Sequence, residues 1–511
     1  MDKEKESVPE FGSPDWSRIL TPDSSPVSKV IETHCSWVML AGSTAYKVKK
    51  PVQLGFLNYS TLARRYQACR RELEVNRPFA PQLYHDVVAV TQSPEGWRVE
   101  GDGKIVDYAV KMTRFEDDLL LSTQLENGQV EVRQMQSLAD QIIAYHTALP
   151  PVTRTGSGPT VASLSRPMLL NFEYLEDHLT SSHVESISKL REWACDQLNA
   201  LAPQIEQRIS GGYIRPCHGD LHLENLIVWH NRFVAFDAIE FNDSFREIDV
   251  VNELAFLAMD LEDRGHFEHA HELLNHYFEQ TLDYQALPLL RLYQVYRALV
   301  RAKVDLIQQL QHTGQERGEW SDKGAAYLEL AKRFAMPEKP RLFMTHGLSG
   351  SGKSTFARSW IRKHGGFQLR SDALRRVVEK ERLHTQSPAT SPARDSQEAS
   401  PARYSQEVSE ATYARLTAEA KAILEAGYSV FADATYLKKW QRKMLFDMAR
   451  ELGTHVEVID FDVSHEILRQ RILDRHNDLS EATTEVLESQ IQSQERLTED
   501  EQVAIIETIR D

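Results

Sequence analysis

The stretch Gly347-Leu-Ser-Gly350-Ser351-Gly352-Lys353-Ser354-Thr355 matches the pattern G-x-x-x-x-G-K-[ST] at every fixed position. Glycines at these positions let backbone N–H groups turn inward around phosphates, the lysine reaches the β- and γ-phosphates, and the hydroxyl binds Mg²⁺. The apolar segment 342–345 precedes the loop, and a helical pattern begins near Lys353. A strand, a glycine-rich loop and a helix in this order predict a phosphate-binding loop.

Beyond the loop, apolar segments typical of strands alternate with segments of helical periodicity. The predicted strands after the loop are 429–432 and 455–459, and the predicted helices are 373–380, 413–426 and 440–452. Such alternation predicts a parallel sheet covered by helices on both faces. The near-repeats 391–398 and 400–407 interrupt the pattern, and they contain few residues that would build a core. They predict a disordered insertion near residues 386–403, although the second copy runs into a predicted helix.

Two aspartates follow predicted strands, where the carboxyl edge of a parallel sheet collects functional side chains. Asp372 comes after the predicted strand that ends near Arg370, and it is a candidate base for the proton of an attacking hydroxyl. It is equally suited to cap the following helix. Asp433 ends a strand at the position of a Mg²⁺-binding carboxylate, with Ser354 as the second candidate ligand.

Three arginines, Arg469, Arg471 and Arg475, lie on one predicted helical segment. Arginines that close over ATP stabilise charge in the transition state, and such contacts are worth about 10³–10⁵ in rate. We therefore take Arg471 and Arg475 as candidate catalytic lid residues. The alternative is an exposed, charged helix face.

Residues 341 to about 500 resemble the small P-loop kinases of the zeta-toxin-like and polynucleotide-kinase-like type, an AAA-type P-loop group. The resemblance rests on 347–355, Arg370-Ser-Asp372, Val430-Phe-Ala-Asp433-Ala-Thr435 and the stretch 469–475. It implies ATP-dependent phosphorylation of a hydroxyl with Asp372 as the base. Acceptors in that group range from nucleotide sugars to sugar acids to nucleic-acid ends, so the acceptor does not transfer.

A second phosphoryl-transfer pattern stands far upstream of the loop. His218-Gly-Asp220-Leu-His-Leu-Glu-Asn225 has the spacing of a protein-kinase catalytic loop, H-x-D-x-x-x-x-N. Asp220 is the candidate base and Asn225 a candidate Mg²⁺ ligand. Asp237 follows the predicted hairpin 226–236, where a second metal-binding aspartate belongs. His218 and His222 are expected to act as structural hydrogen-bonding residues.

The kinase pattern also requires a lysine on a strand and a glutamate on a helix. The predicted hairpin 36–49 carries Lys47 and Lys49 on one face. We favour Lys47 as the phosphate-binding lysine, with Lys49 as the open alternative. On the predicted helix 61–77, Glu72 is the favoured partner and Glu74 the competitor. The glycine-rich loop of protein kinases is absent, and Glu32-Thr-His-Cys-Ser36 stands in its place.

This half closely resembles the aminoglycoside phosphotransferase family. The residues that carry the resemblance are His218–His222, Asn225, Asp237 and Phe245-Arg-Glu-Ile-Asp249. The full arrangement, after about residue 28, resembles the two-domain proteins labelled bifunctional aminoglycoside phosphotransferase/ATP-binding protein. The resemblance implies a protein-kinase-like N-terminal fold that uses ATP and Mg²⁺. Related kinases act on choline, homoserine, fructosamine and macrolides, so no antibiotic substrate follows from it.

Domain limits are predicted from composition. Residues 1–27 are polar, rich in Pro and Ser and without period, which predicts a flexible arm. Residues 28–335 form the predicted kinase-like domain, a small sheet with one helix followed by a mostly helical part. The stretch Met336-Pro-Glu-Lys-Pro340 is the predicted boundary, and 341–511 the predicted P-loop domain.

Bulk properties exclude several classes of protein. A net charge of −16 argues against nucleic-acid binding through bulk electrostatics. No apolar run reaches the roughly 18 residues of a membrane helix. The N-terminus shows no signal-peptide pattern. Four cysteines without C-x-x-C spacing indicate reduced thiols and a cytoplasmic protein.

The leading interpretation is an enzyme with two Mg·ATP sites that each phosphorylate a hydroxyl of a small molecule. Two alternatives stay open at this point. The C-terminal half is a nucleotide or nucleic-acid-end kinase, or one half is a degenerate ATP-binding regulator of the other.

Overall fold

The computed structural model describes residues 15–22, 24–33, 35–54, 57–94, 96–153, 158–180, 183–315, 318–386, 406–474 and 483–510. By contacts the chain divides into two compact units. The first holds residues up to 131, 141–260 and 306–319; the second holds 132–140, 261–305 and the residues from 320 onward. Among the helices in the described ranges, none has the length and apolar content that a membrane crossing requires. All four cysteines are free thiols.

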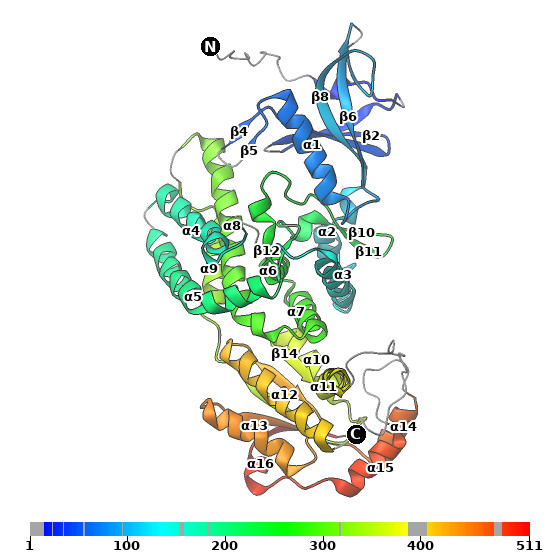
Figure 1. Cartoon of the computed structure of the whole chain (residues 1–511), viewed down its shortest axis with the longest axis vertical. Helices are drawn as coiled ribbons and strands as arrows, with labels where there is room; N and C mark the ends of the chain where they lie inside the picture. Colours follow the sequence, from blue (N-terminus) through cyan, green and yellow to red (C-terminus); the bar gives the residue numbers. More distant parts are fainter. Residues whose placement is uncertain are drawn as a thin grey trace. The chain divides into compact units, whose positions relative to one another are not determined.

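The first unit begins with a six-stranded antiparallel sheet in the order β1-β2-β3-β8-β6-β7. Its strands are Val27–Glu32 (β1), Ser36–Ala41 (β2), Thr44–Lys49 (β3), Tyr84–Ser93 (β6), Gly96–Val99 (β7) and Lys104–Thr113 (β8). The short strands Gln53–Leu54 (β4) and Leu57–Asn58 (β5) pair separately. Helix α1, Leu62–Asn76, begins at the capping side chain of Thr61 and packs against β8 and β6 (Figure 1). The predicted small sheet with one helix is confirmed.

The predicted flexible arm is wrong for its second half. Trp16 and Ile19 are buried in the sheet core, and the Trp16 ring centroid lies 5.4 Å from that of Trp37. The backbone of Leu20 exchanges hydrogen bonds with Trp97 and Val99. The prediction was wrong because isolated apolar residues between prolines and serines give no periodic signal. A single buried tryptophan can nevertheless hold a segment against a core through its large apolar area. Residues 1–14 of the predicted arm lie outside the described residues.

The remainder of the first unit is mainly helical, as the sequence predicts. Its elements are Leu121–Glu126 (α2), Gln134–Ala148 (α3), Val161–His178 (α4), Val184–Ser210 (α5), Ile214–Pro216 (β9), Leu226–Trp229 (β10), Arg232–Ala235 (β11), Glu247–Asp249 (β12) and Val250–Asp263 (α6). Residues 134–140 of α3 and 261–263 of α6 group with the second unit. Strands β10 and β11 form the predicted hairpin. The hairpin places the loop before β10 and the residue after β11 close together, which positions the catalytic candidates.

The second unit contains a five-stranded parallel sheet in the order β14-β15-β13-β16-β17. Its strands are Leu342–His346 (β13), Phe367–Arg370 (β14), Val430–Asp433 (β15), Val456–Asp462 (β16) and Ile505–Arg510 (β17). Its helices are Phe267–Thr281 (α7), Leu287–Thr313 (α8), Asp322–Ala335 (α9), Lys353–His364 (α10), Ser371–Gln386 (α11), Gln406–Glu425 (α12), Lys439–Glu451 (α13), His465–Leu473 (α14), Thr484–Ser493 (α15) and Glu499–Val503 (α16). Most residues of α8 belong to this unit.

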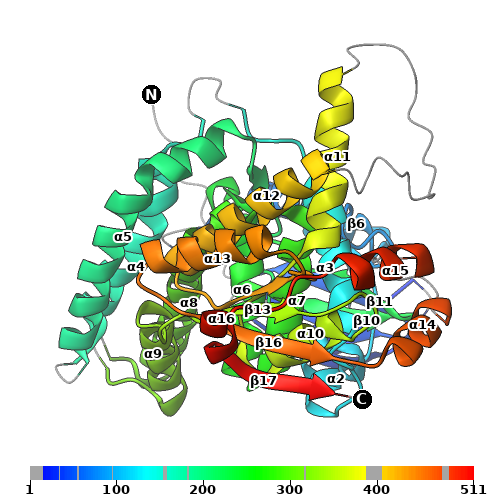
Figure 2. The same cartoon turned by 90° about the horizontal axis from the view of Figure 1, so that it is seen from below.

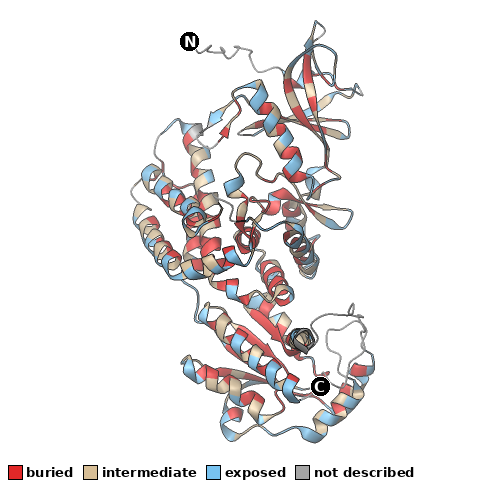
Figure 3. Ribbon diagram, viewed as in Figure 1, coloured by how far each residue is buried: buried red, intermediate tan, exposed pale blue. Residues whose placement is uncertain are grey.

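Helices cover both faces of this sheet, which confirms the predicted α/β architecture. Helix α10 buries Phe343 and Phe431 on one face, and α12 and α13 lie on the other (Figure 2). Every residue of β14 and β15 is buried, in keeping with the red strands of Figure 3. Strands buried on both faces are typical of parallel sheets. The predicted insertion lies outside the described residues, except that residue 386 ends α11.

Helix α7 groups by contacts with the P-loop sheet. Phe278 of α7 packs edge to face on Phe367 of β14, with ring centroids 5.3 Å apart. The predicted boundary at 336–340 assigned α7 to the kinase-like part of the chain. The compact units follow contacts instead, and the domain limits remain a prediction.

Candidate active sites

Two lysines of β3 share one buried carboxylate in the first unit. Lys47 Nζ lies 2.9 Å from Glu72 Oε1, and Lys49 Nζ lies 2.6 Å from Glu72 Oε2. The two lysines then diverge: Lys47 reaches Asp237 Oδ1 at 2.5 Å, whereas Lys49 pairs with Glu240. The predicted lysine–glutamate pair is therefore present, and both lysines take part in it.

Burial distinguishes the two lysines. The Lys49 side chain is 1% exposed and that of Lys47 is 12% exposed, beside Asp237. Burial disfavours both ammonium groups, but Asp237 and Glu72 hold the pKa of Lys47 well above its usual value. Lys47 is thus a permanent cation next to the metal-binding candidate, and Lys49 has the position of a structural ion-pair residue. Glu74 is exposed and pairs with Arg71.

Glu72→Gln is expected to lower the free energy of unfolding by about 3–5 kcal/mol, because it leaves two buried ammonium groups without their shared carboxylate. Glu74→Gln, on the same helix but exposed, should change it by less than about 0.5 kcal/mol. Urea unfolding followed by tryptophan fluorescence measures both. Equal effects of the two substitutions would contradict the assignment of Glu72 as the partner of both lysines.

The catalytic-loop pattern folds into a compact turn that faces Asp237. Asn225 Nδ2 donates to Asp220 Oδ2 at 3.1 Å, so the candidate base and the candidate metal ligand are neighbours. Asp237 has a left-handed backbone, φ 62°, and its N–H donates to the Tyr84 hydroxyl at 3.0 Å. A left-handed non-glycine residue needs such support from its surroundings. Asp220 and Asp237 line one pocket.

Both histidines of the loop have the structural roles that the sequence predicts. His218 Nε2 donates to the carbonyl of Phe236 at 2.8 Å, and its Nδ1 accepts from the N–H of Asp220 at 3.3 Å. His222 Nδ1 accepts from the N–H of Glu224 at 3.3 Å and so caps the turn at 223–225. Each ring fixes the backbone next to Asp220.

His218 makes stability depend on pH. Burial lowers the pKa of His218 below its usual value of 6.5. The unfolded chain therefore takes up a proton at a higher pH than the folded chain, and stability is lost as pH falls below about 6.5. The stability difference between wild type and His218→Gln should be largest at pH 7.5 and shrink towards pH 5 in urea titrations. A difference that stays constant with pH would show that this group does not titrate with folding.

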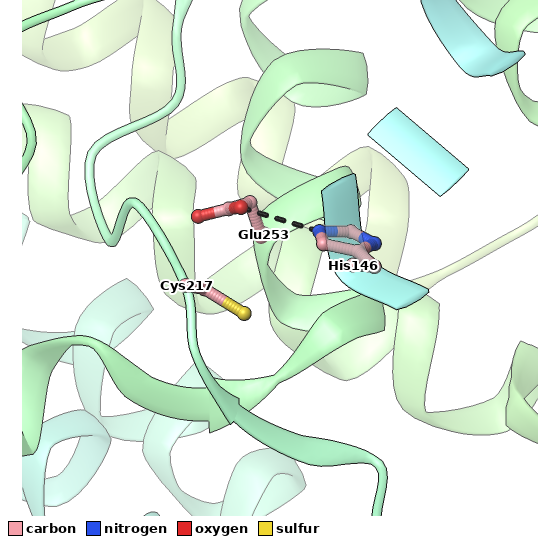
Figure 4. Close-up of side chains that lie close together, drawn as sticks. All are labelled: His146, Cys217 and Glu253. Carbon is pink, nitrogen blue, oxygen red and sulfur yellow. Dashed lines mark hydrogen bonds and ion pairs between the residues drawn. The ribbon is translucent and has the colours of Figure 1, made fainter. Parts of the chain in front are cut away.

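Figure 4 shows His146, Cys217 and Glu253 together beside the loop. Their ligand atoms lie within 4.8 Å of one another, a spacing that a metal ion would accept. Both oxygens of Glu253 are engaged: His146 Nε2 donates to Oε1 at 3.2 Å and the N–H of Gly219 donates to Oε2 at 2.8 Å. Burial would raise the pKa of Glu253, but the hydrogen bond and charge of His146 keep it below its usual range. Glu253 thus acts as an ionised anchor for the loop.

The loop needs glycine at position 219. Its φ is 86°, and an added Cβ would lie 2.8 Å from the carbonyl oxygen of Phe245. Farther along, Asp260 Oδ2 accepts from the N–H of Leu223 at 2.9 Å. Two carboxylates of α6 therefore hold the two ends of the turn that carries Asp220.

The pocket of the first unit is lined by both charged and apolar side chains. The charged ones are Lys47, Lys49, Arg114, Asp117, Asp220, Asp237 and Glu240. The apolar wall is formed by Val38, Leu40, Ala45, Met112, Phe115 and Phe236. Thr33 and Cys35, from the turn between β1 and β2, also line it. In the sequence this turn stands where protein kinases have their glycine-rich loop, and two of its residues lie at the pocket.

In the second unit, the phosphate-binding loop lies between β13 and α10 as predicted. Gly347 needs a φ of 141°, and an added Cβ there would lie 2.7 Å from the carbonyl oxygen of Phe461. Gly350 and Gly352 are also left-handed. Lys353 is largely buried, and its Nζ donates to the carbonyl of Leu348 at 2.6 Å. The lysine is thus held within its own loop.

Asp372 and Asp433 line the same pocket as the loop residues 349, 350 and 352–355. Asp433 Oδ2 accepts a hydrogen bond from Gln368 Nε2 at 2.7 Å, and the same amide nitrogen donates to the carbonyl of Ser354 at 3.2 Å. Asp372 lies in the first turn of α11, so it has both predicted positions, at the pocket and at a helix start. The structure therefore brings together the predicted base, the predicted metal ligands and the loop.

The candidate lid arginines are placed differently. Arg469 Nε lies 2.7 Å from Glu488 Oε1 of α15, and Arg471 is exposed on α14. Among the described residues, those that line the pocket do not include Arg471. Arg475 lies outside the described residues. A catalytic role for Arg471 and Arg475 remains a prediction.

Several residues that hold these sites together have no signal in the sequence patterns. Glu240 pairs with Lys49 and accepts from the Tyr59 hydroxyl at 2.8 Å. Gln490 of α15 binds both the N–H and the hydroxyl of Ser349 in the phosphate loop at 3.0 Å. A polar residue three positions after Asp237 was the only local hint of Glu240. The contact of Gln490 spans 141 residues of sequence, beyond the reach of any motif.

Residues 342–497 match the family model described as an AAA domain. The C-terminal part of the chain is thus a P-loop domain of AAA type, which confirms the prediction made from the loop and the alternating strands.

Relatives match over both units. The chain is 27% identical over 468 residues to the uncharacterized protein Rv2004c of Mycobacterium tuberculosis (strain ATCC 25618 / H37Rv), covering 90% of this chain and 89% of that protein. The same figures hold for the uncharacterized protein Mb2027c of Mycobacterium bovis (strain ATCC BAA-935 / AF2122/97).

Two solved structures each resemble part of the chain. A sugar kinase from Janibacter sp. HTCC2649 is 21% identical, covers 34% of this chain and 85% of its own, and has a TM-score of 0.24. A choline/ethanolamine kinase family protein from Mesorhizobium loti is 13% identical, covers 61% and 87%, and has a TM-score of 0.35. Because both TM-scores are below 0.5, these structures do not support an argument about function. The function is therefore argued from the residues of this chain.

Proposed function

We propose that the chain is an ATP-dependent phosphotransferase with two separate sites, each of which transfers the γ-phosphate of Mg·ATP to a hydroxyl group of a small molecule. One observation supports this above all. In each unit, a lysine, an aspartate suited as base and oxygen ligands suited to Mg²⁺ lie at one pocket. The lysines are Lys47 and Lys353, and the bases are Asp220 and Asp372.

The donor atoms of both pockets fit the cofactors. Mg²⁺ prefers oxygen ligands. Asp237 lines the first pocket, and Asn225 is hydrogen-bonded to Asp220, which also lines it. The second pocket offers Ser354 and Asp433. The apolar wall of the first pocket suits a purine ring, with Lys47 at the phosphate end. When bound, Mg²⁺ neutralises charge on the β- and γ-phosphates. The protein itself positions the acceptor hydroxyl and takes its proton through Asp220 or Asp372.

A small-molecule acceptor is supported by charge. The chain carries a net charge of −16, which disfavours a nucleic-acid acceptor held by its phosphate backbone. Reduced cysteines agree with a cytoplasmic location, which remains part of the proposal. The experiment that tests the function is a screen of a metabolite extract with γ-labelled ATP, using wild type, Asp220→Asn and Lys353→Ala.

Labelled products that disappear in one variant but not in the other would assign an acceptor to each site. Products that persist unchanged in both variants would overturn both assignments. If all products disappear in either variant alone, the two sites are not independent, and a regulatory role for one half replaces the two-enzyme interpretation.

A further inference from the structure

Asp433 lies in a chain of buried polar side chains that extends away from the P-loop pocket. Besides the hydrogen bond from Gln368, Arg370 Nε lies 3.9 Å from Asp433 Oδ2. Gln368 and Arg370 both belong to β14, and Arg370 stands opposite Asp433 in the register of β14 and β15. Gln368 is 1%, Arg370 8% and Asp433 4% exposed. Charges in such surroundings interact strongly because water screens them little.

Helix α7 holds the strand that carries these two neighbours. Asn275 Oδ1 accepts from the backbone N–H of Gln368 at 2.8 Å, and Glu279 Oε1 lies 3.7 Å from Arg370 Nη1. Asn275 and Glu279 are themselves buried. The guanidinium of Arg370 is therefore shared between a carboxylate of α7 and the candidate Mg²⁺ ligand of the P-loop site.

The same helix also binds α10, which begins at Lys353. Glu279 Oε2 lies 2.8 Å from Arg358, and Glu272 Oε2 lies 2.7 Å from Arg362. Helix α7 precedes the residues 342–497 that match the AAA family model. A helix outside that region thus contacts both the helix after the phosphate loop and the strand beside Asp433.

We propose that Glu279 is a positioning residue of the P-loop site, which draws the charge of Arg370 away from Asp433 and so leaves the Asp433 carboxylate available to Mg²⁺. This inference rests on the proposed function of the P-loop site. Without the negative charge of Glu279, Arg370 would pair more closely with Asp433. A guanidinium on that carboxylate competes directly with a divalent cation, because both bind the same oxygens.

The test measures the Mg²⁺ dependence of ATP binding to the full chain by isothermal titration calorimetry. Because the chain has two proposed ATP sites, binding at the P-loop site is defined as the ATP binding that is lost in Lys353→Ala. We expect Glu279→Gln to raise the Mg²⁺ concentration for half-maximal P-loop binding about tenfold, the usual size of an indirect effect on a metal ligand. Arg370→Gln should lower this concentration, and the double variant should follow Arg370→Gln.

Glu272→Gln is the matched control. It removes a buried carboxylate from the same helix. The ion pairs of Glu272 are with Arg358 and Arg362 of α10 and not with Arg370. Its Mg²⁺ requirement should equal that of wild type. A Glu279→Gln variant that behaves like Glu272→Gln, or a double variant no better than Glu279→Gln, would overturn the inference.

Two further outcomes are decisive. If Glu279→Gln does not fold, Arg370→Gln decides alone: a lower Mg²⁺ requirement supports the inference, and an equal or higher one overturns it. If wild type shows no Lys353-dependent ATP binding at all, the proposed function of the P-loop site is wrong. The experiment can therefore show that Glu279 has no positioning role even when the P-loop site does bind ATP.

Discussion

Asp220→Asn is expected to slow phosphoryl transfer at the first site by about 10²–10⁴-fold, the usual contribution of a general base. The substitution keeps the volume of the side chain and an oxygen that can accept the hydrogen bond from Asn225. The anchors of the loop, Glu253 on Gly219 and Asp260 on Leu223, are backbone contacts that it does not touch. The loss should therefore fall on kcat and leave the unfolding temperature unchanged.

The measurement is single-turnover transfer of labelled phosphate to an acceptor assigned to the first site by the extract screen. Glu224→Gln is the control, because Glu224 is an exposed carboxylate in the same loop. Its rate should equal that of wild type, and P-loop products should persist in both variants. Intact transfer in Asp220→Asn over a wide panel of acceptors would show that Asp220 is not the base.

Local patterns predicted the positions of the catalytic candidates because their chemistry depends on spacing along one turn. Asp220 and Asn225 lie within one loop, and Gly347 to Ser354 within another, so the motif already contains the geometry. The β10–β11 hairpin adds Asp237 through a short connection of fixed register. These are the cases in which few residues separate the groups that meet in space.

Choices between neighbouring residues required the folded structure. Lys47 and Lys49 lie on one face of β3, and both reach Glu72, so alternation along the strand could not separate them. What separates them is the position of Glu240 and Asp237, about 190 residues away. In the same way, helix α1 buries the Glu72 side chain and exposes that of Glu74. The apolar pattern of a short helix does not show which of two residues this close in sequence faces the core.

Contacts made by residues outside any motif were missed. Nothing local marks Asn275 or Glu279 of α7 as supports of β14, and Trp16 gave no periodic signal before the first strand. The sequence boundary at 336–340 followed prolines, which mark breaks in local structure, whereas α7 joins the P-loop sheet through buried aromatic packing and ion pairs. Prolines report where the backbone turns, and they carry no information on which sheet a preceding helix covers.

Lys353→Ala is expected to reduce phosphoryl transfer at the P-loop site by about 10²–10³-fold, the usual effect of removing one group that stabilises charge in the transition state. Lys353 Nζ now donates to the carbonyl of Leu348 and, at 3.3 Å, to the hydroxyl of Ser351, so the cation is held within its own loop. Alanine keeps the helix and the backbone N–H groups but removes the only side chain of the motif that brings a positive charge to the β- and γ-phosphates.

Lys363→Ala is the matched control for this substitution, since Lys363 lies on the same helix α10 and is exposed. It removes an equal charge from the chain, so any long-range electrostatic effect on ATP binding is common to both variants. Labelled-phosphate transfer to a P-loop acceptor should fall only in Lys353→Ala, while products of the Asp220 site persist in both. If the two lysine variants lose the same activity, net charge rather than contact with phosphate explains the loss, and the phosphate-binding role of Lys353 is wrong.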